Sequence, residues 1–328
     1  MRNILLPISA IVPTRNRRVS LERMLNSLAR QSAQPVEMVV VDASTNDDTE
    51  RLCKSLISGL ETKIIYRRAQ TVGAAAQRNQ AIRHVSQQTI WFVDDDVIFK
   101  PDCLERLWSA LQSDPRLGGV NAMIVNQKYS PPGFVSRLLF QFLNGRAEES
   151  YAGKCIGPAL NLLPEDRPDL PEVVFVEWLN TTCTLYRREA LPELPFPNHF
   201  TGYSMMEDVA LSLVAGRQWK LANARTAQIF HESQAGDHKN NIRLLSEMEL
   251  MNRHYVMTRV LRRQSRKDYF NLAALQLFSI SSLLTSFRGW KSLPAVVAGN
   301  LGGLRKISQA SYHRRRDAEP PENIYPLW

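Results

Sequence analysis

The chain has 328 residues, of which 44% are apolar and 22% are charged, as in an ordinary globular protein. This composition excludes a disordered, collagen-like or coiled-coil chain, and the length allows one large α/β domain with an extension or two modest domains. The net charge of +9 is uneven, because residues 1–236 contain 26 Lys and Arg against 25 Asp and Glu, whereas residues 237–316 contain 15 against 4. The neutral main body argues against a nucleic-acid-binding protein.

The first 120 residues alternate short apolar runs with segments of helical periodicity. This alternation is typical of βαβ units and predicts a mostly parallel sheet with helices on its faces. Pro101 is expected to open a helix in its first turn. Strands are predicted at 8–12, 36–41, 63–66 and 89–93, and helices at 19–28, after 44–49, and at 73–85.

Residues 127–172 contain many prolines and are predicted to be irregular. Patterned segments then return, with strands expected at 173–176 and 182–186, a helix from Glu207 to Val214 that Gly216 ends, and an extended segment from Trp219 to His231.

A basic helical segment is predicted over residues 242–263 and an uncharged one over residues 269–287. On a helical wheel Phe270, Leu272 and Leu277 share one side and Asn271 lies on the other, although Leu275 does not fit. The pattern predicts one amphipathic helix, and packing on the main domain and lying in a membrane interface both remain open. The basic charge of residues 237–316 is either a solvated face or a surface for anionic lipid or a phosphorylated ligand.

The cysteines and the N-terminus bear on location. None of the four cysteines has another at a Cys-x-x-Cys spacing, so a zinc or redox motif is not expected and a reducing compartment fits. The first apolar run is interrupted by Pro7 and Pro13 and lacks the features of a secretory signal. We expect a cytoplasmic protein, with peripheral attachment to the inner face of the membrane as an option.

Three carboxylates, Asp94, Asp95 and Asp96, directly follow the strand predicted at residues 89–93. They repel one another, and hard oxygen ligands of this kind suit Mg²⁺ or Mn²⁺. Thr14 and Asp42 also follow predicted parallel strands, and the carboxyl ends of such strands meet at one edge of the sheet, where ligands bind. The alternative is a helix cap that carries surplus charge.

The strand that ends in an Asp-x-Asp type motif, after a first strand ending in Pro13-Thr14, resembles the family 2 glycosyltransferases of the GT-A fold. The resemblance covers about residues 8–235 and rests on five motifs in order. These are residues 11–17, residues 40–49, the Arg78-Asn79 helix start within residues 76–82, the acids 94–96, and Glu207-Asp208 followed by His231.

The resemblance implies a GT-A domain over residues 1–236, in which residues 1–120 bind the nucleotide sugar and residues 173–236 hold the acceptor and catalytic groups. Residues 237–316 would be a helical extension and residues 317–328 a tail. The implied activity is metal-dependent, inverting transfer of a sugar from a nucleoside-diphosphate sugar to a hydroxyl group of a lipid-linked or polysaccharide acceptor in cell-surface glycan synthesis.

The same resemblance assigns roles to single residues. Asp208 would be the general base and Glu207 would orient the acceptor; each could instead complement a helix dipole. Asp96, Asp94 and His231 would hold Mn²⁺ or Mg²⁺. Residues for the nucleotide sugar would be Pro13, Thr14, Arg15, Asp42, Arg78, Asn79, Asp94 and Asp95.

Two residues are candidates for the acceptor site. Trp178 offers a flat ring for a sugar, and Asn180 is near it in sequence, although a core Trp is an equal alternative. Arg15 stands where the family often has an aromatic residue, so UDP, dTDP and GDP sugars all remain open.

Two other functions compete with sugar transfer. A nucleotide-binding oxidoreductase would need Gly-x-Gly-x-x-Gly after the first strand, and residues 13–17 contain no glycine. A non-catalytic binding or scaffold protein with the same fold is the remaining alternative, and the retained acids argue against it.

Overall fold

The computed structural model describes residues 4–55, 57–233 and 241–317, which fall into two compact units. The first unit comprises residues 4–130, 152–154 and 162–233, and the second comprises residues 131–151, 155–161 and 241–317. The predicted domain boundary at residue 236 and the predicted tail from residue 318 onward lie outside the described residues.

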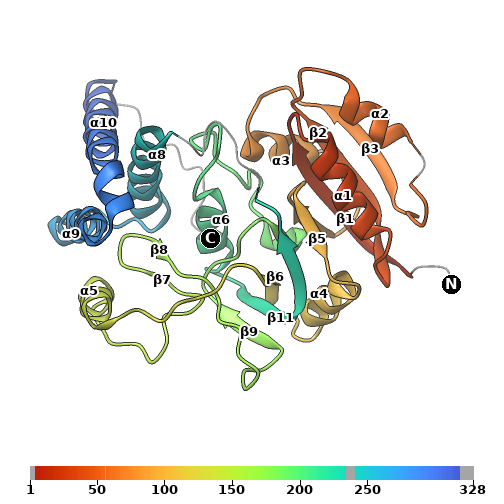
Figure 1. Ribbon diagram of the computed structural model, residues 1–328, viewed down its shortest axis with the longest axis horizontal. Coiled ribbons are helices and arrows are strands. Elements are labelled where there is room, and N and C mark those ends of the chain that lie inside the picture. The colour runs from red at the N-terminus through yellow and green to blue at the C-terminus, as the bar shows by residue number, and fades with distance from the viewer. Residues whose placement is uncertain (1–3, 56, 234–240, 318–328) are drawn as a thin grey trace. The chain divides into compact units, whose positions relative to one another are not determined.

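The first unit is built on one large sheet (Figure 1). Its N-terminal half is parallel and has the order β3-β2-β1-β4. These strands are β1 (Ile4–Thr14), β2 (Ala33–Asp42), β3 (Lys63–Arg68) and β4 (Thr89–Val93).

The sheet continues with β10 (Cys183–Arg187), β6 (Leu117–Ile124), β11 (Lys220–His231) and β5 (Val97–Phe99), while β9 (Val173–Val176) pairs with β11. Strand β10 runs antiparallel to β4 and β6, and β11 runs parallel to β6. The predicted α/β class with helices around a large sheet and further helices at the C-terminal end is confirmed.

Helices connect the strands of the first unit as the sequence pattern indicated. They are α1 (Arg18–Leu28), α2 (Asp48–Lys54), α3 (Ala74–Ile82), α4 (Cys103–Gln112) and α6 (Glu207–Ala215), with one 3₁₀ turn at Arg188–Ala190. The expectation that Pro101 lies in the first turn of a helix was wrong, because α4 begins at Cys103 after the turn formed by Pro101 and Asp102.

The central strands are buried on both faces, which explains their nearly unbroken apolar sequences. Side chains alternate across the sheet, so Trp91 and Val93 join the core formed with α1 and α4. Phe92 points to the opposite face and packs edge-on against Phe196 and Tyr186 at ring-centroid distances of 5.3 and 6.1 Å.

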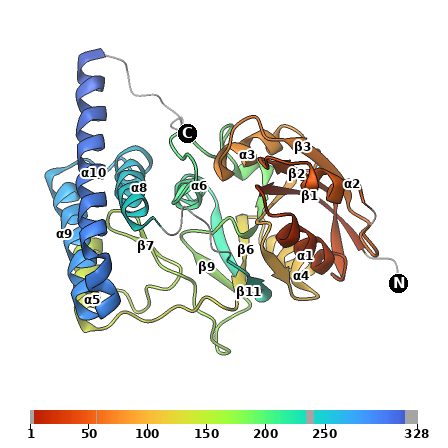
Figure 2. The same cartoon turned by 45° about the horizontal axis from the view of Figure 1, so that its top comes forward.

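The second unit is mainly helical and is seen from a second direction in Figure 2. It contains α5 (Phe134–Asn144), the two-stranded β7 (Cys155–Ile156) and β8 (Leu160–Asn161), and α8 (Ile242–Tyr255), which continues into a π-helical turn (Val256–Val260). Helix α9 (Arg266–Ser282), a 3₁₀ turn (Leu283–Thr285) and α10 (Phe287–Asp317) follow. None of the helices in residues 4–55, 57–233 and 241–317 is long and apolar enough to cross a membrane.

Two predictions for the second unit were wrong. The segment expected to be irregular contains α5, which begins directly after Pro131-Pro132-Gly133 and ends at Gly145 in the left-handed conformation. The single amphipathic helix expected over residues 269–287 is interrupted, because Ser286 is extended between the 3₁₀ turn and α10. Its polar face was also misassigned, since Asn271 is buried while Phe270 and Leu277 are exposed.

Gln77 of α3 fastens the ends of β1 and β2 together. Its buried side-chain amide donates to the carbonyl oxygens of Thr14 and Val41 at 2.9 and 2.7 Å, and its own oxygen accepts from the Gly73 amide at 3.3 Å. Since both strand ends lead into candidate site residues, this side chain helps to fix where those residues lie.

Replacing Gln77 by Leu should therefore lower the free energy of unfolding by about 1–3 kcal/mol, because the Thr14 and Val41 carbonyl oxygens lose the hydrogen bonds that Gln77 donates. Chemical denaturation of the purified chain measures this change. Gln88→Leu at an exposed position is the matched control and should shift the midpoint little. Equal stability of the two variants would contradict the role given to Gln77.

Candidate active site

Asp94, Asp95 and Asp96 lie between the end of β4 and the start of β5. The carboxyl group of Asp94 is partly exposed, at 25%, whereas those of Asp95 and Asp96 are each 4% exposed. Buried carboxylates need partners that offset the loss of hydration. The arrangement of those partners defines the site.

Asp95 is held from the end of β1. The Thr14 hydroxyl donates to Asp95 Oδ2 at 2.6 Å, and Arg17 Nη1 donates to Asp95 Oδ1 at 2.8 Å and to Asp96 Oδ2 at 3.1 Å. Burial raises the pKa of Asp95 to about 7, although Arg17 and Thr14 favour its ionised form. Thr14 and Asp95 are 81 residues apart in the sequence. Their contact shows that the ends of β1 and β4 meet at one edge of the sheet, as predicted.

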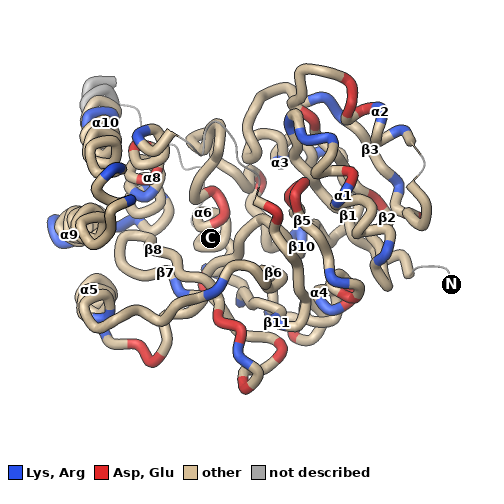
Figure 3. Tube along the Cα trace, viewed as in Figure 1, with Lys and Arg blue, Asp and Glu red and all other residues tan. Residues whose placement is uncertain are grey.

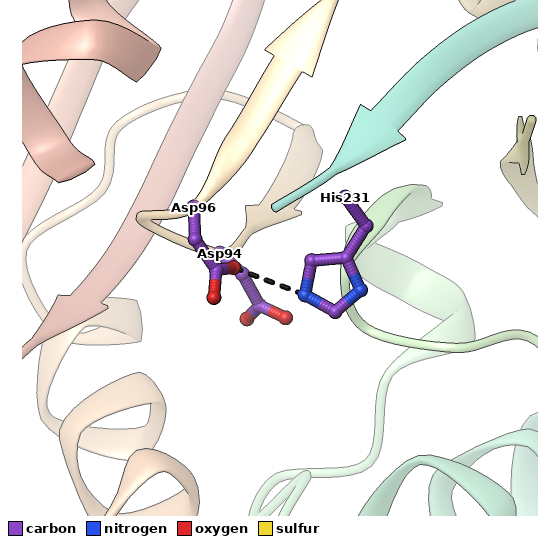
Figure 4. A group of neighbouring side chains, drawn as sticks. All are labelled: Asp94, Asp96 and His231. Atoms are coloured by element: carbon purple, nitrogen blue, oxygen red, sulfur yellow. Dashed lines mark ion pairs between the residues drawn. The ribbon is translucent and has the colours of Figure 1, made fainter. Parts of the chain in front are cut away.

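Asp96 faces His231, the last residue of β11 (Figure 4). His231 Nε2 lies 3.0 Å from Asp96 Oδ1, and one ligand atom from each of Asp94, Asp96 and His231 lies within 4.8 Å of the others. The imidazole is positioned by Gln127, whose amide nitrogen is 3.2 Å from Nδ1. Asn126 bonds the His231 backbone through both ends of its amide. Two carboxylates and an imidazole are a donor set that divalent transition metals accept.

Arg78 joins the aspartates to the acid pair at the start of α6. Its guanidinium, 3% exposed, donates to Asp94 Oδ1 at 2.7 Å and to Glu207 Oε1 at 2.9 Å. The ring of Phe196 lies 5.6 Å from its central carbon. Burial alone would disfavour the charge, but Asp94 and Glu207 together raise the pKa of Arg78.

Glu207 and Asp208 form the first turn of α6. Before them the backbone takes positive φ at Ser204 (57°) and Met206 (70°), and the buried Ser204 hydroxyl accepts from the Ala75 amide of α3 at 3.3 Å. This loop therefore seats the acids against α3. Glu207 is engaged by Arg78, whereas the half-buried Asp208 accepts at 2.7 Å from the Val209 amide that follows it. Burial raises the pKa of both carboxyl groups.

Asp42 ends β2 and is fully buried. Its Oδ1 accepts from the amide of Ser44 at 2.8 Å and also from the Ser44 hydroxyl. Its Oδ2 accepts from the Tyr66 hydroxyl at 3.1 Å and from Arg68 at 3.4 Å. Burial and the Asp42 charge raise the pKa of Tyr66 to about 12, so the phenol stays a donor.

The other predicted nucleotide-sugar residues are placed differently from one another. Arg15 is exposed after β1, and Pro13 is buried within it opposite Val41. The Asn79 amide exchanges two hydrogen bonds with the Phe196 backbone, at 2.5 and 3.2 Å, and so fastens that loop to α3.

The two acceptor candidates also differ. Trp178 is 6% exposed and its indole N–H donates to the Leu162 carbonyl at 2.7 Å, which favours the alternative of a core tryptophan. Asn180 has a buried Oδ1 that forms no hydrogen bond among the described residues.

Sequence reasoning did not single out Arg17 or Gln127. Arg17 lies in the same turn as Thr14 and Arg15, so its position next to two predicted site residues could have identified it. Gln127 is 104 residues from His231, and only the pairing of β6 with β11 brings them together.

Comparisons with known proteins agree with this geometry. Residues 9–159 match the model of the family described as glycosyl transferase family 2. This match agrees with the resemblance to the family 2 glycosyltransferases found in the sequence motifs.

Two curated relatives match about a third of the chain. "Glycosyltransferase GlyA" of Streptococcus pneumoniae is 30% identical over 114 residues, which is 34% of this chain and 16% of the relative. "GalNAc(5)-diNAcBac-PP-undecaprenol beta-1,3-glucosyltransferase" of Campylobacter jejuni is 32% identical over 91 residues, or 27% of this chain and 29% of the relative. The chain thus spans well under half the length of the curated relatives it matches.

A solved structure shares the fold over most of the chain. The mannosyltransferase PcManGT of Pyrobaculum calidifontis, in complex with GDP-Man and Mn²⁺, matches with a TM-score of 0.55 at 17% identity. The match covers 91% of this chain and 87% of that one, and it supports the GT-A fold predicted from the sequence motifs.

Replacing Arg78 by Met should cost about 3–5 kcal/mol of stability, because Asp94 and Glu207 would lose the guanidinium that both contact. Thermal and chemical denaturation measure the loss. Arg83→Met, at an exposed position just after α3, is the matched control. Equal stability of the two variants would show that the Arg78 pairs contribute no more than surface ion pairs.

Proposed function

We propose that the chain transfers a sugar from a nucleoside-diphosphate sugar to a hydroxyl group, with inversion at the anomeric carbon. The observation that carries the proposal is an excess of carboxylates at one sheet edge. Five carboxyl groups lie close enough there for their charges to repel one another, and two guanidinium groups, those of Arg17 and Arg78, partly offset the negative charge. The five belong to Asp94, Asp95, Asp96, Glu207 and Asp208. A site with this charge is suited to a cation that carries a diphosphate.

The donor would lie along the ends of β1, β2 and β4. Asp42, with Tyr66 and Arg68 around it, marks the end that would face the nucleotide base. Thr14 and Asp95 follow along the same edge, near the ribose and the sugar, and the exposed Arg15 is free to reach the base or the phosphates. Arg78 contacts Asp94 and Glu207 from inside the protein, so we assign it to positioning these acids rather than to direct phosphate binding.

The cation would be held by Asp94, Asp96 and His231, whose oxygen and imidazole donors suit Mn²⁺ or Mg²⁺. When bound, it would supply Lewis-acid stabilisation of the negative charge on the departing diphosphate. Arg17 partly neutralises Asp96 in the structure, and once the cation is bound its guanidinium could pair with a phosphate of the donor instead. The structure with Mn²⁺ from Pyrobaculum is of the same fold and supports this reading.

Asp208 is the proposed general base. Among the described residues its carboxylate forms no ion pair like the one that Arg78 forms with Glu207. Burial raises the pKa of Asp208 to about 6, toward the range in which a base works well at neutral pH. It would accept the proton of the acceptor hydroxyl as that oxygen attacks the anomeric carbon. Glu207, fixed by Arg78, would orient the acceptor.

The acceptor is proposed to be lipid-linked or a growing polysaccharide of the cell surface, reached from the cytoplasmic side. The Campylobacter relative acts, by its name, on an undecaprenol-linked glycan, and this supports the class of acceptor.

Calorimetric titration with UDP, GDP and dTDP, each with Mn²⁺ and again with EDTA, should show metal-dependent binding of one nucleotide. Asp96→Asn should weaken that binding by at least about tenfold, because it removes a charged ligand of the cation. Asp102→Asn, at the nearby N-cap of α4, is the matched control and should bind normally. If the folded chain binds none of the nucleotides, the transferase proposal fails and a non-catalytic role becomes the leading one.

Asp208→Asn should lower kcat for sugar transfer by about 10²–10⁴-fold and leave nucleotide affinity unchanged, because the amide cannot accept the proton. In the wild-type enzyme kcat should fall as the pH drops through the raised pKa of Asp208, since only the ionised carboxylate is a base. Steady-state assays of nucleoside diphosphate release measure both effects. Glu189→Gln, exposed in the 3₁₀ turn, is the control. Near-normal kcat in Asp208→Asn would remove this residue from the base role.

A further inference from the structure

Exposed apolar side chains are concentrated in the second unit. Of the 22 large hydrophobic residues that are exposed within the described chain, 15 belong to this unit, although it is the smaller of the two. Scattered exposed apolar residues are normal on soluble proteins, but a concentration of them on neighbouring elements marks an interaction surface.

Helix α10 carries the longest part of this surface. Phe287, Trp290, Val297, Leu301 and Leu304 are 75%, 58%, 37%, 62% and 54% exposed. They follow one another at steps of three, seven, four and three residues, so they form one stripe along the helix.

The stripe is not the face that α10 uses for packing. That face contains Gly299 and Gly303, where an added Cβ would press on the backbone of Arg243 and Glu247 in α8. The glycines allow the two helices to approach closely, so the packing side of α10 is already occupied. The apolar stripe therefore has no role in holding α10 on α8.

Helices α9 and α5 extend the surface. Phe270, Leu277 and Leu284 are exposed at steps of seven residues, and the ring of Phe270 lies 6.1 Å from that of Phe142 in α5. The Trp290 indole donates to the Leu284 carbonyl at 3.0 Å, which joins the 3₁₀ turn to α10. We call these exposed residues of α5, α9, the turn and α10 the apolar face.

The charges around the apolar face are predominantly basic, and Asp268 in the first turn of α9 is an exception. Residues 269–316 contain no Asp or Glu and residues 131–147 contain none either, whereas Arg137, Arg288, Lys291 and Arg305 are exposed there. Figure 3 shows the blue segments along α10. Lys291 Nζ lies 4.7 Å from the ring centroid of Phe287, so cationic and apolar groups alternate at close range. A second copy of the chain would bring these basic groups against their own kind, which disfavours self-association through this face.

We propose that the apolar face binds the surface of a bilayer that contains anionic lipid. The exposed rings and leucines would enter the boundary between head groups and acyl chains, and the Lys and Arg side chains would meet the lipid phosphates. The inference stands on the second unit alone and does not depend on the proposed sugar transfer.

Co-sedimentation of the full chain with vesicles tests the proposal. Vesicles of phosphatidylcholine with about one third phosphatidylglycerol should bind the wild type at least about tenfold better than vesicles of phosphatidylcholine alone, and added salt should weaken this binding. Equal binding to both kinds of vesicle, or to neither, would overturn the proposal.

Variants separate the apolar face from a general effect of charge. Leu301→Glu should reduce binding to the anionic vesicles at least about tenfold, because it puts a carboxylate into the apolar stripe. Val19→Glu makes the same change at an exposed position of α1 in the first unit and should bind like the wild type. Arg288→Gln with Lys291→Gln should lower binding to anionic vesicles by about twentyfold and spare any weak binding to neutral ones.

Circular dichroism and sedimentation velocity complete the test. Each variant must have the same melting temperature as the wild type. If Leu301→Glu fails to fold, the double variant Arg288→Gln with Lys291→Gln still tests the proposal, because it leaves the apolar stripe intact. If the wild type ignores vesicles but forms a dimer that Leu301→Glu dissociates, the face serves self-association and the proposal is wrong. Equal loss of vesicle binding in Val19→Glu would also overturn it.

Discussion

The buried guanidinium of Arg78 is the interaction on which the candidate site depends. It lies between Asp94, at the end of β4, and Glu207, at the start of α6, and contacts one oxygen of each. Without it, two carboxylates would face each other in a poorly hydrated place, where their repulsion is strongest. Because Arg78 belongs to α3, the same contact ties three elements together. The acids can therefore be close enough for joint chemistry without driving the elements apart.

Much of this architecture is legible in the sequence, for definable reasons. Strand β4 is fully buried and β1 and β2 are buried over most of their length, so their apolar runs stand out. Their polar ends mark the edge where Thr14 meets Asp95. Strand β6 carries no such signal, because Gly118 and Gly119 stand in its sequence. The fold explains them, because an added Cβ would collide with Trp219 and Ala190 at Gly118, and with Tyr186 and Leu179 at Gly119.

The site shows the same division between local and distant information. The run of three aspartates is recognisable in the sequence, because adjacent carboxylates repel one another and therefore indicate a functional site. The partners of the site residues come from far along the chain. Arg17 contacts Asp95 from 78 residues away and Gln127 contacts His231 from 104 residues away, and no local periodicity reports such contacts. Trp178 shows that a sequence signal can also mislead. Its position in the sequence favours a platform for a sugar ring, but its indole is buried and donates to the Leu162 carbonyl.

The second unit poses a different physical problem, because its apolar residues are not explained by its own packing. Helix α10 could have buried its large side chains against α8 and left small ones outside. It does the reverse, with Gly299 and Gly303 inward and Trp290 and Leu301 outward. Exposing such side chains to water costs free energy, and burying them against α8 would have recovered it. An arrangement that forgoes this gain, with mainly Lys and Arg near the exposed rings, is the one expected of a surface that binds a partner outside the chain.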